Sequence, residues 1–192
     1  INSTADLSIQ KFSGYIQDNI HFGKNNRNIT LQAGVRYNYN TLNNEFLIIP
    51  RAGASYTPTK WKKDIIFKGS AGLYHQPPFY REMRRPDGTV NTNLKAQRSW
   101  QISTGMDYAF KMLSRPFRFS AEAYYKNMSA IVPYDMHNLQ LRYYGENNAK
   151  AFAYGVEGRL FGELVKDSES WLSVGIMKTM ENLDNDYYYN FY

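Results

Sequence analysis

The sequence predicts an all-β protein, an antiparallel meander of about eight long strands that forms a segment of a transmembrane β-barrel. Alternation is the first observation behind this prediction. Two segments, Trp100–Phe110 and Phe117–Lys126, alternate apolar or aromatic residues with polar or charged ones. A period of two indicates a strand, because successive side chains leave a strand on opposite faces. Each segment has the roughly 9–11 residues that a tilted strand needs to cross a bilayer.

Composition is the second observation. Aromatic residues make up 16% of the chain and include 17 Tyr, as expected where aromatic girdles lie at both membrane interfaces. The net charge of +6 is dispersed along the strands, which argues against a nucleic-acid partner. The absence of cysteine excludes disulfides and thiolate metal sites. No run approaches the ~18 apolar residues of a membrane helix.

Eight strands follow from the same alternation. They are Leu7–Phe22, Ile29–Tyr39, Phe46–Tyr56, Asp64–His75, the pair Trp100–Phe110 and Phe117–Lys126 within a hairpin at Lys95–Ile131, Ala149–Leu164 and Trp171–Met180. Asp18 interrupts the apolar face of the first strand. Pro50 cannot donate a ladder hydrogen bond, so we expect it at an edge, a strand end or a bulge.

The lengths of the connections are the third observation. Those near 23–28, 57–63, 111–116 and 165–170 are short. The stretches 76–94 and 132–148 are long and irregular, the short link 40–45 lies on their side, and Asn182–Tyr192 is a loop-like tail. Outer-membrane barrels place short turns in the periplasm and long loops outside, whereas a lipocalin-like soluble barrel need not. The first strand then starts outside and the last ends outside. We therefore expect residues 1–192 to be a partial barrel domain, an open curved sheet with two unpaired edges.

Side-chain parity predicts the face that turns to the lumen. Eight charged residues share it: Arg36, Arg51, Lys68, Asp107, Arg118, Glu122, Glu157 and Arg159. A charge facing lipid at the bilayer midplane costs ~2–4 kcal/mol, so this parity is constrained. The opposite set should face lipid: Ile29, Leu31, Val35, Ile102, Met106, Phe119 and Ala123.

Several stretches resemble TonB-dependent outer-membrane receptors. Leu31–Tyr37 followed by Ile49–Pro58 is similar to their pattern A-G-x-R-Y, a loop, then P-R-x-x-x-x-Y-x-P. Gly72–Pro78 is similar to the G-x-Y-x-Q-x-P strand end that comes next. Ala121–Lys126 and Tyr154–Glu157 resemble the later E-x-Y-Y-K and G-x-E elements. The order and spacing of these stretches extend over nearly the whole chain.

The resemblance implies a location in the bacterial outer membrane and a barrel of about 22 strands plugged by an N-terminal domain. The plug domain is not present in this chain. The family imports an external ligand (an iron chelate, a glycan, a peptide or a vitamin) with energy from the TonB complex, delivered through the plug. Outer-membrane lipid and lipopolysaccharide are further implied partners, and a surface lipoprotein could accompany the receptor. The alternative is a barrel that transports nothing and serves as an adhesin or a structural anchor.

Candidate ligand residues lie in the two long loops: Tyr80, Arg81, Arg84, Arg85, Tyr143 and Tyr144. The Arg fork suits carboxylate or phosphate groups, and tyrosine rings can stack on a sugar, a peptide or an iron chelate. Contact with lipopolysaccharide phosphates, solvation, or an aromatic girdle is the more common role of such residues. His21, His75 and His137 lie far apart without ligand spacing. We expect no catalytic residue, no metal and no cofactor, because no Ser or acidic constellation marks an outer-membrane lipase or protease.

Overall fold

The computed structural model describes residues 9–23, 28–137, 139–165, 167–184 and 186–190, apart from the side chain of His137. These residues form the following elements: β1 (Lys11–Phe22), β2 (Ile29–Asn40), β3 (Glu45–Tyr56), β4 (Asp64–Gln76), α1 (Tyr80–Met83), β5 (Gln97–Met112), β6 (Arg115–Ile131), β7 (Tyr134–His137), β8 (Gln140–Tyr143), β9 (Ala149–Val165), β10 (Ser168–Leu183) and β11 (Tyr188–Asn190). Eight strands have 12 residues or more, in agreement with the meander that alternation predicts.

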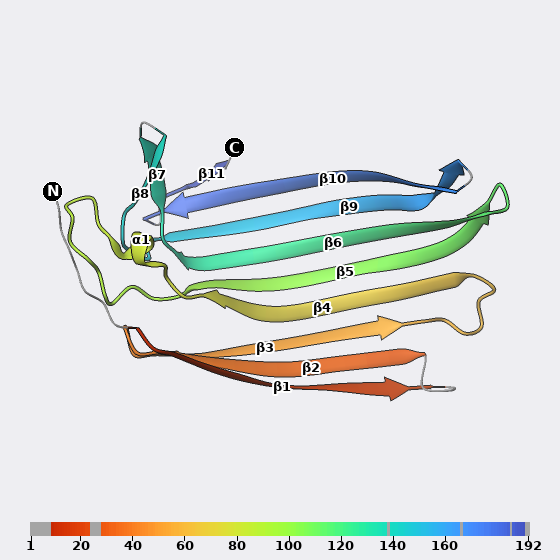
Figure 1. Cartoon of the computed structure of the whole chain (residues 1–192), viewed down its shortest axis with the longest axis horizontal. Helices are drawn as coiled ribbons and strands as arrows, with labels where there is room; N and C mark the ends of the chain where they lie inside the picture. The colour runs from red at the N-terminus through yellow and green to blue at the C-terminus, as the bar shows by residue number, and fades with distance from the viewer. Residues whose placement is uncertain (1–8, 24–27, 138, 166, 185, 191–192) are drawn as a thin grey trace.

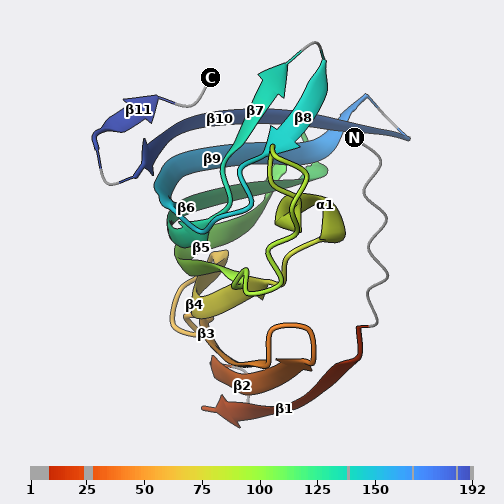
Figure 2. The ribbon, with the colours of Figure 1, turned by 90° about the vertical axis from the view of Figure 1, so that its left-hand side faces the viewer.

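The long strands form one open antiparallel sheet in the order β1-β2-β3-β4-β5-β6-β9-β10-β11 (Figure 1). Viewed from the loop end, the sheet is an arc (Figure 2). Among the described residues, β1 pairs with β2 alone, so strand one is not hydrogen-bonded to the last strands. The predicted open, curved sheet is therefore confirmed. No helix in the described ranges is long and apolar enough to cross a membrane.

The polar face of the sheet is its concave face. Gln97 lies on the same side of β5 as Asp107, because both occupy odd positions of one strand. The Gln97 side chain donates to Glu82 of α1 (3.1 Å), and α1 lies inside the curve in Figure 2. The strand registers connect the eight charged residues predicted for the lumen to this side, and the predicted lipid-facing set to the convex side. The predicted separation of the two sets onto opposite faces of the sheet is thus confirmed.

By register, five charged strand residues depart from this separation of faces: Asp18, Lys150, Lys178 and, at strand ends, Arg98 and Arg115. Asp18 lies opposite Ala33 on the convex side, as its sequence position predicted. The alternation of β9 and β10 also places Lys150 and Lys178 there, opposite Asn182 and Tyr154. Lysine has a long apolar stem that lets its ammonium reach an interface, so such positions are tolerated near a strand end.

Aromatic rings gather near both ends of the convex face. Tyr108 and Phe110 stack with their centroids 5.1 Å apart, and Phe110 stacks on Phe117 at 5.8 Å, beside the β5–β6 turn. At the loop end, Phe152 stacks on Tyr154 at 6.2 Å. This distribution agrees with the aromatic girdles that the composition predicted.

Several predicted boundaries need correction. The predicted start at Leu7 and most of the turn 23–28 lie outside the described residues. The strand predicted as Trp171–Met180 extends to Leu183. Part of the tail predicted to be loop-like is strand, because β11 pairs with Met180–Asn182. The backbone groups beyond Met180 thus gain a ladder partner that alternation alone did not reveal.

The two long connections are also more ordered than predicted. The stretch 76–94 contains the single-turn helix α1, and 132–148 contains the β7–β8 hairpin. Neither has the length that a periodic sequence pattern needs to be recognised. The hairpin turns at Leu139, whose φ of +60° lies in the left-handed region.

Pro50 marks the place where β3 parts from β4. The β3–β4 ladder ends at the pair Arg51 and Gly72, although β3 continues to Glu45 beside β2 and β4 continues to Gln76 beside β5. Proline has no N–H to donate, so the ladder can end there without leaving a proline donor unsatisfied. Pro50 thus lies inside β3, at a local edge where the strand has no partner on the β4 side, and an edge is one of the three positions that the sequence predicted. We call the gap between Glu45–Pro50 and Leu73–Gln76 the β3–β4 seam.

The two largest fully buried side chains, Met83 and Leu94, lie in an apolar cluster of the loops. Met83, Leu94 and Val132 pack together, and Leu42, Val90 and Tyr143 cover them. The cluster joins the turn after β2 to both long connections, so it holds the loops of one rim together. A bilayer-spanning sheet has less need of such a core, because lipid covers one of its faces.

A turn prediction follows from the β5–β6 connection. Leu113 and Ser114 adopt φ of +53° and +62°, the geometry that Asn-Gly prefers in a two-residue hairpin. Replacing both (Leu113→Asn with Ser114→Gly) should raise the free energy of unfolding by about 1 kcal/mol, because the left-handed strain is relieved. Leu113 is 78% exposed, so little packing is lost. Urea unfolding of the full-length protein in lipid vesicles would measure the change. Leu113→Ala keeps the strain and serves as the control; an equal gain there would contradict the explanation.

The loop core generates a second prediction. Met83→Ala should destabilise the loops by about 2–5 kcal/mol, because it leaves a cavity at a side chain with 0% exposure. Amide hydrogen exchange should accelerate by about 30-fold or more in 80–96 and 132–148 and stay unchanged in the middle of β5 and β6. Met136→Ala, at a position 62% exposed in β7, is the matched control. Faster exchange throughout the sheet would show that the loops and the barrel wall unfold together.

Candidate functional site

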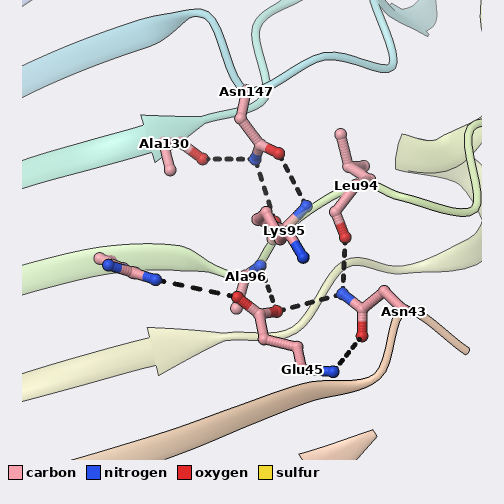
Figure 3. Close-up of polar contacts among 8 residues, drawn as sticks. Asn43, Glu45, Leu94, Lys95, Ala96, Ala130 and Asn147 are labelled. Carbon is pink, nitrogen blue, oxygen red and sulfur yellow. Dashed lines mark hydrogen bonds and ion pairs between the residues drawn. The ribbon is translucent and has the colours of Figure 1, made fainter. Parts of the chain in front are cut away.

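The turn after β2 and the two long connections, 76–94 and 132–148, together form what we call the loop rim. Buried polar side chains join its segments across the β3–β4 seam (Figure 3). The Asn43 amide donates to the Leu94 carbonyl (2.7 Å) and to Glu45 Oε2 (3.1 Å). The same carboxylate oxygen accepts from the backbone N–H of Ala96 (2.8 Å). Glu45 Oε1 lies 4.0 Å from Nη2 of Arg98. Residues from the turn after β2 therefore hold the segment that enters β5.

Asn147 fastens the second long connection to the same segment. It accepts from the N–H of Lys95 (2.7 Å) and donates to the carbonyls of Lys95 (3.0 Å) and Ala130 (2.7 Å). Asn91 adds a hydrogen bond from its amide to the carbonyl of Gly145 (2.8 Å). Each of these bonds joins a side chain to backbone groups that a long loop would otherwise leave unpaired.

Glu82 anchors α1 within the rim. Its side chain accepts from the N–H of Phe79 (2.8 Å) and from Gln97 (3.1 Å), and the residue is buried. Sequence reasoning missed Asn43, Glu45, Glu82 and Asn147, because isolated Asn and Glu residues in loops have no distinguishing spacing. Their burial is decided by the contacts between loops.

The predicted cluster Tyr80, Arg81, Arg84 and Arg85 is divided by the structure. The first three are exposed at α1 and directly after it. Arg85 is partly buried, and its Nη2 lies 3.3 Å from Glu146 Oε1. The Thr89 hydroxyl and N–H donate to the nearby Asp87, which holds the pKa of that carboxyl below its usual value. This part of the loop therefore carries its own anions, and Arg85 is already paired.

The tyrosines of the second loop are divided in the same way. Tyr143 packs against the loop core, with its ring centroid 5.9 Å from that of Tyr134. Tyr144 is 42% exposed and is held through its backbone N–H, which donates to Pro133 O (3.0 Å). The Arg85–Glu146 pair brings the two loops side by side. A ligand role for the six predicted residues stays a prediction.

The concave wall holds the other candidate region. Lys68 pairs with Asp107, which also accepts from the Ser120 hydroxyl (2.8 Å). Glu122 and Glu157 lie directly opposite each other on β6 and β9. Like charges in that position repel. The guanidinium of Arg159 lies over the ring of Phe161 at 5.6 Å. Three ion pairs form among the described residues: Lys68–Asp107, Arg85–Glu146 and Arg98–Glu45. None of them includes Glu122 or Glu157.

Both regions present polar and aromatic groups without a metal-binding cluster in the described residues. In the part of the chain that the structure describes, no three His, Cys, Asp or Glu residues gather closely enough to hold a metal ion. The loop rim presents arginine forks and phenol rings to the outside, and the concave wall presents carboxylates and guanidinium groups. Such groups recognise charged or aromatic partners through hydrogen bonds and stacking.

Comparisons with known proteins agree with this architecture. A family model described as "TonB dependent receptor-like, beta-barrel" matches residues 1–190. No curated protein sequence matches the chain. Among solved structures, the chain is similar to the siderophore receptor PirA from Pseudomonas aeruginosa, with a TM-score of 0.67 and 16% identity over 93% of this chain. At that identity the likeness shows the fold alone, and this chain spans 35% of the length of the PirA chain. Since the family model covers nearly every residue, the chain belongs to the TonB-dependent receptor β-barrel family.

Proposed function

We propose that this chain is part of the wall of an outer-membrane receptor that imports a small external ligand with energy from the TonB complex. A plug domain, outside this chain, fills the lumen and transmits that energy. The loop rim meets the ligand first, through the exposed Tyr80, Arg81, Arg84 and Tyr144. Lys178 lies on the convex face opposite Tyr154, a position suited to lipopolysaccharide phosphates.

The acidic pair on the concave wall is the observation that carries this proposal. Glu122 and Glu157 are exposed, face each other across one strand gap, and repel. A cationic side chain of an inserted domain would convert the repulsion into two charge-assisted hydrogen bonds, each stronger than a neutral one. The pair is thus a seat for the plug.

The coding sequence upstream offers the first test. A domain of about 100 residues or more should precede the barrel. A mature protein that begins with barrel strands would contradict the proposal and favour the adhesin or anchor.

Removing the two charges should destabilise the receptor if a cation of the plug lies between the carboxylates, and should stabilise it if no cation lies there. In the full-length receptor, Glu122→Gln with Glu157→Gln should loosen the plug, because each lost charge-assisted bond costs about 1.5–3 kcal/mol. Proteolysis of the plug in outer-membrane vesicles should then be at least about tenfold faster, and energy-dependent uptake slower. If no cation sits between the carboxylates, the same change relieves repulsion and the receptor becomes more stable. Glu163→Gln, on the same strand and face, is the matched control.

A further inference from the structure

A hollow of the concave wall beside the β3–β4 seam carries basic side chains that the chain itself does not neutralise. Arg36 and Arg51 line it together with Ile49, and Lys11 lies at its edge. Arg36 lies opposite Ile49, and Arg51 comes two residues later on the same face. Diagonal neighbours of this kind are about 7–8 Å apart, so both guanidinium groups can reach one small group between them.

Lysine and arginine differ on this face: Lys68 has an ion-pair partner, whereas four arginines have none among the described residues (Arg36, Arg51, Arg118 and Arg159). Lys68 lies on the same face, and Asp107 neutralises it. Arg36 and Arg51 take part in none of the ion pairs given by the described residues. Glu45 also borders the hollow; its Oε2 accepts from Ala96 and Asn43, and its Oε1 lies 4.0 Å from Nη2 of Arg98.

Both arginines are held in orientation by uncharged groups. Arg36 donates from Nε to Asn38 Oδ1 (3.1 Å), which leaves its two terminal amino groups available. Arg51 crosses over Gly72 and places Cζ 4.2 Å from the centre of the Tyr74 ring. A Cβ at Gly72 would lie 3.0 Å from Arg51 Cγ, so the glycine gives the side chain its path.

We propose that Arg36 and Arg51 form a binding site for one oxyanion, a carboxylate or a phosphate. The guanidinium fork matches the two oxygens of such a group, and the stacked, preorganised arginine loses little freedom on binding. Buried Leu47 and Ile49 supply the apolar side of the hollow, with exposed fractions of 4% and 3%. The site suits an anionic group attached to a partly apolar body. The proposal rests on the proposed function only in requiring that the concave face enclose a lumen.

The oxyanion could belong to an external ligand or to an acidic side chain of the domain inserted in the lumen. Citrate and inorganic phosphate, titrated into the purified full-length receptor at low salt, probe the first source. We expect calorimetric binding of one of them to the unaltered receptor. Arg36→Gln and Arg51→Gln should each weaken it by about tenfold or more, as for the loss of a charged hydrogen bond. Gly72→Ala should weaken it while every charge is kept, because Arg51 is displaced.

Arg159→Gln is the matched control, because Arg159 is also stacked on a ring of the same face but lies on β9, outside the hollow. Its anion affinity should stay within about twofold of the unaltered receptor. If neither anion binds the unaltered receptor, the second source is tested by proteolysis of the inserted domain in the Arg36→Gln, Arg51→Gln double variant. If protease releases the inserted domain faster from the double variant than from the unaltered receptor, and circular dichroism shows a folded barrel, the oxyanion belongs to that domain. The site would be overturned if the double variant bound the anion as tightly as the unaltered receptor. It would also be overturned if no anion bound and the inserted domain were released by protease at an unchanged rate. Neither measurement depends on energy-coupled uptake, so the site and the transport function can fail separately.

Discussion

The backbone ladder is the constraint on which the rest of this structure depends. Each long strand inside the sheet gives its N–H and C=O groups to two neighbours, because those groups have no other partner in hydrocarbon. Once the register is fixed, the two-residue period assigns every side chain to the convex or the concave face. The separation of charged from apolar residues follows directly. Where the ladder ends early, at Pro50 beside the seam, side chains take over the task of joining the two sides.

The loop rim obeys a different rule from the wall. The wall needs no packed interior, so the fully buried apolar side chains Met83 and Leu94 belong to the loops. Three buried polar side chains (Asn43, Glu45 and Asn147) form hydrogen bonds with backbone groups of neighbouring segments, and these bonds hold the loops together. The result is an ordered platform that holds some arginines and tyrosines outward and uses others, such as Arg85, to bind one loop to the next.

The concave wall is divided by charge. Arg36 and Arg51 lie on β2 and β3, and the acidic pair lies on β6 and β9 together with Arg118 and Arg159. Between them, Lys68 and Asp107 neutralise each other. A partner inserted in the lumen would meet a basic region on β2 and β3 and a region of mixed charge on β6 and β9, and this favours one orientation of that partner over others.

The sequence by itself determined the class of the fold, the eight long strands and the shared face of the eight charged residues predicted for the lumen. Alternation depends only on neighbouring residues of one strand, so the sequence shows it directly. It assigns the same faces in every register that keeps the apolar residues on one side. Motif order carried the resemblance to the receptor family for the same local reason. Only the tertiary structure decided that Glu45 crosses the seam, that Arg85 is paired while Arg81 is exposed, and that Arg36 and Arg51 share one hollow. Those facts depend on which segments lie side by side, and residues such as Glu45 and Ala96 are too far apart in the sequence for any periodic pattern to relate them.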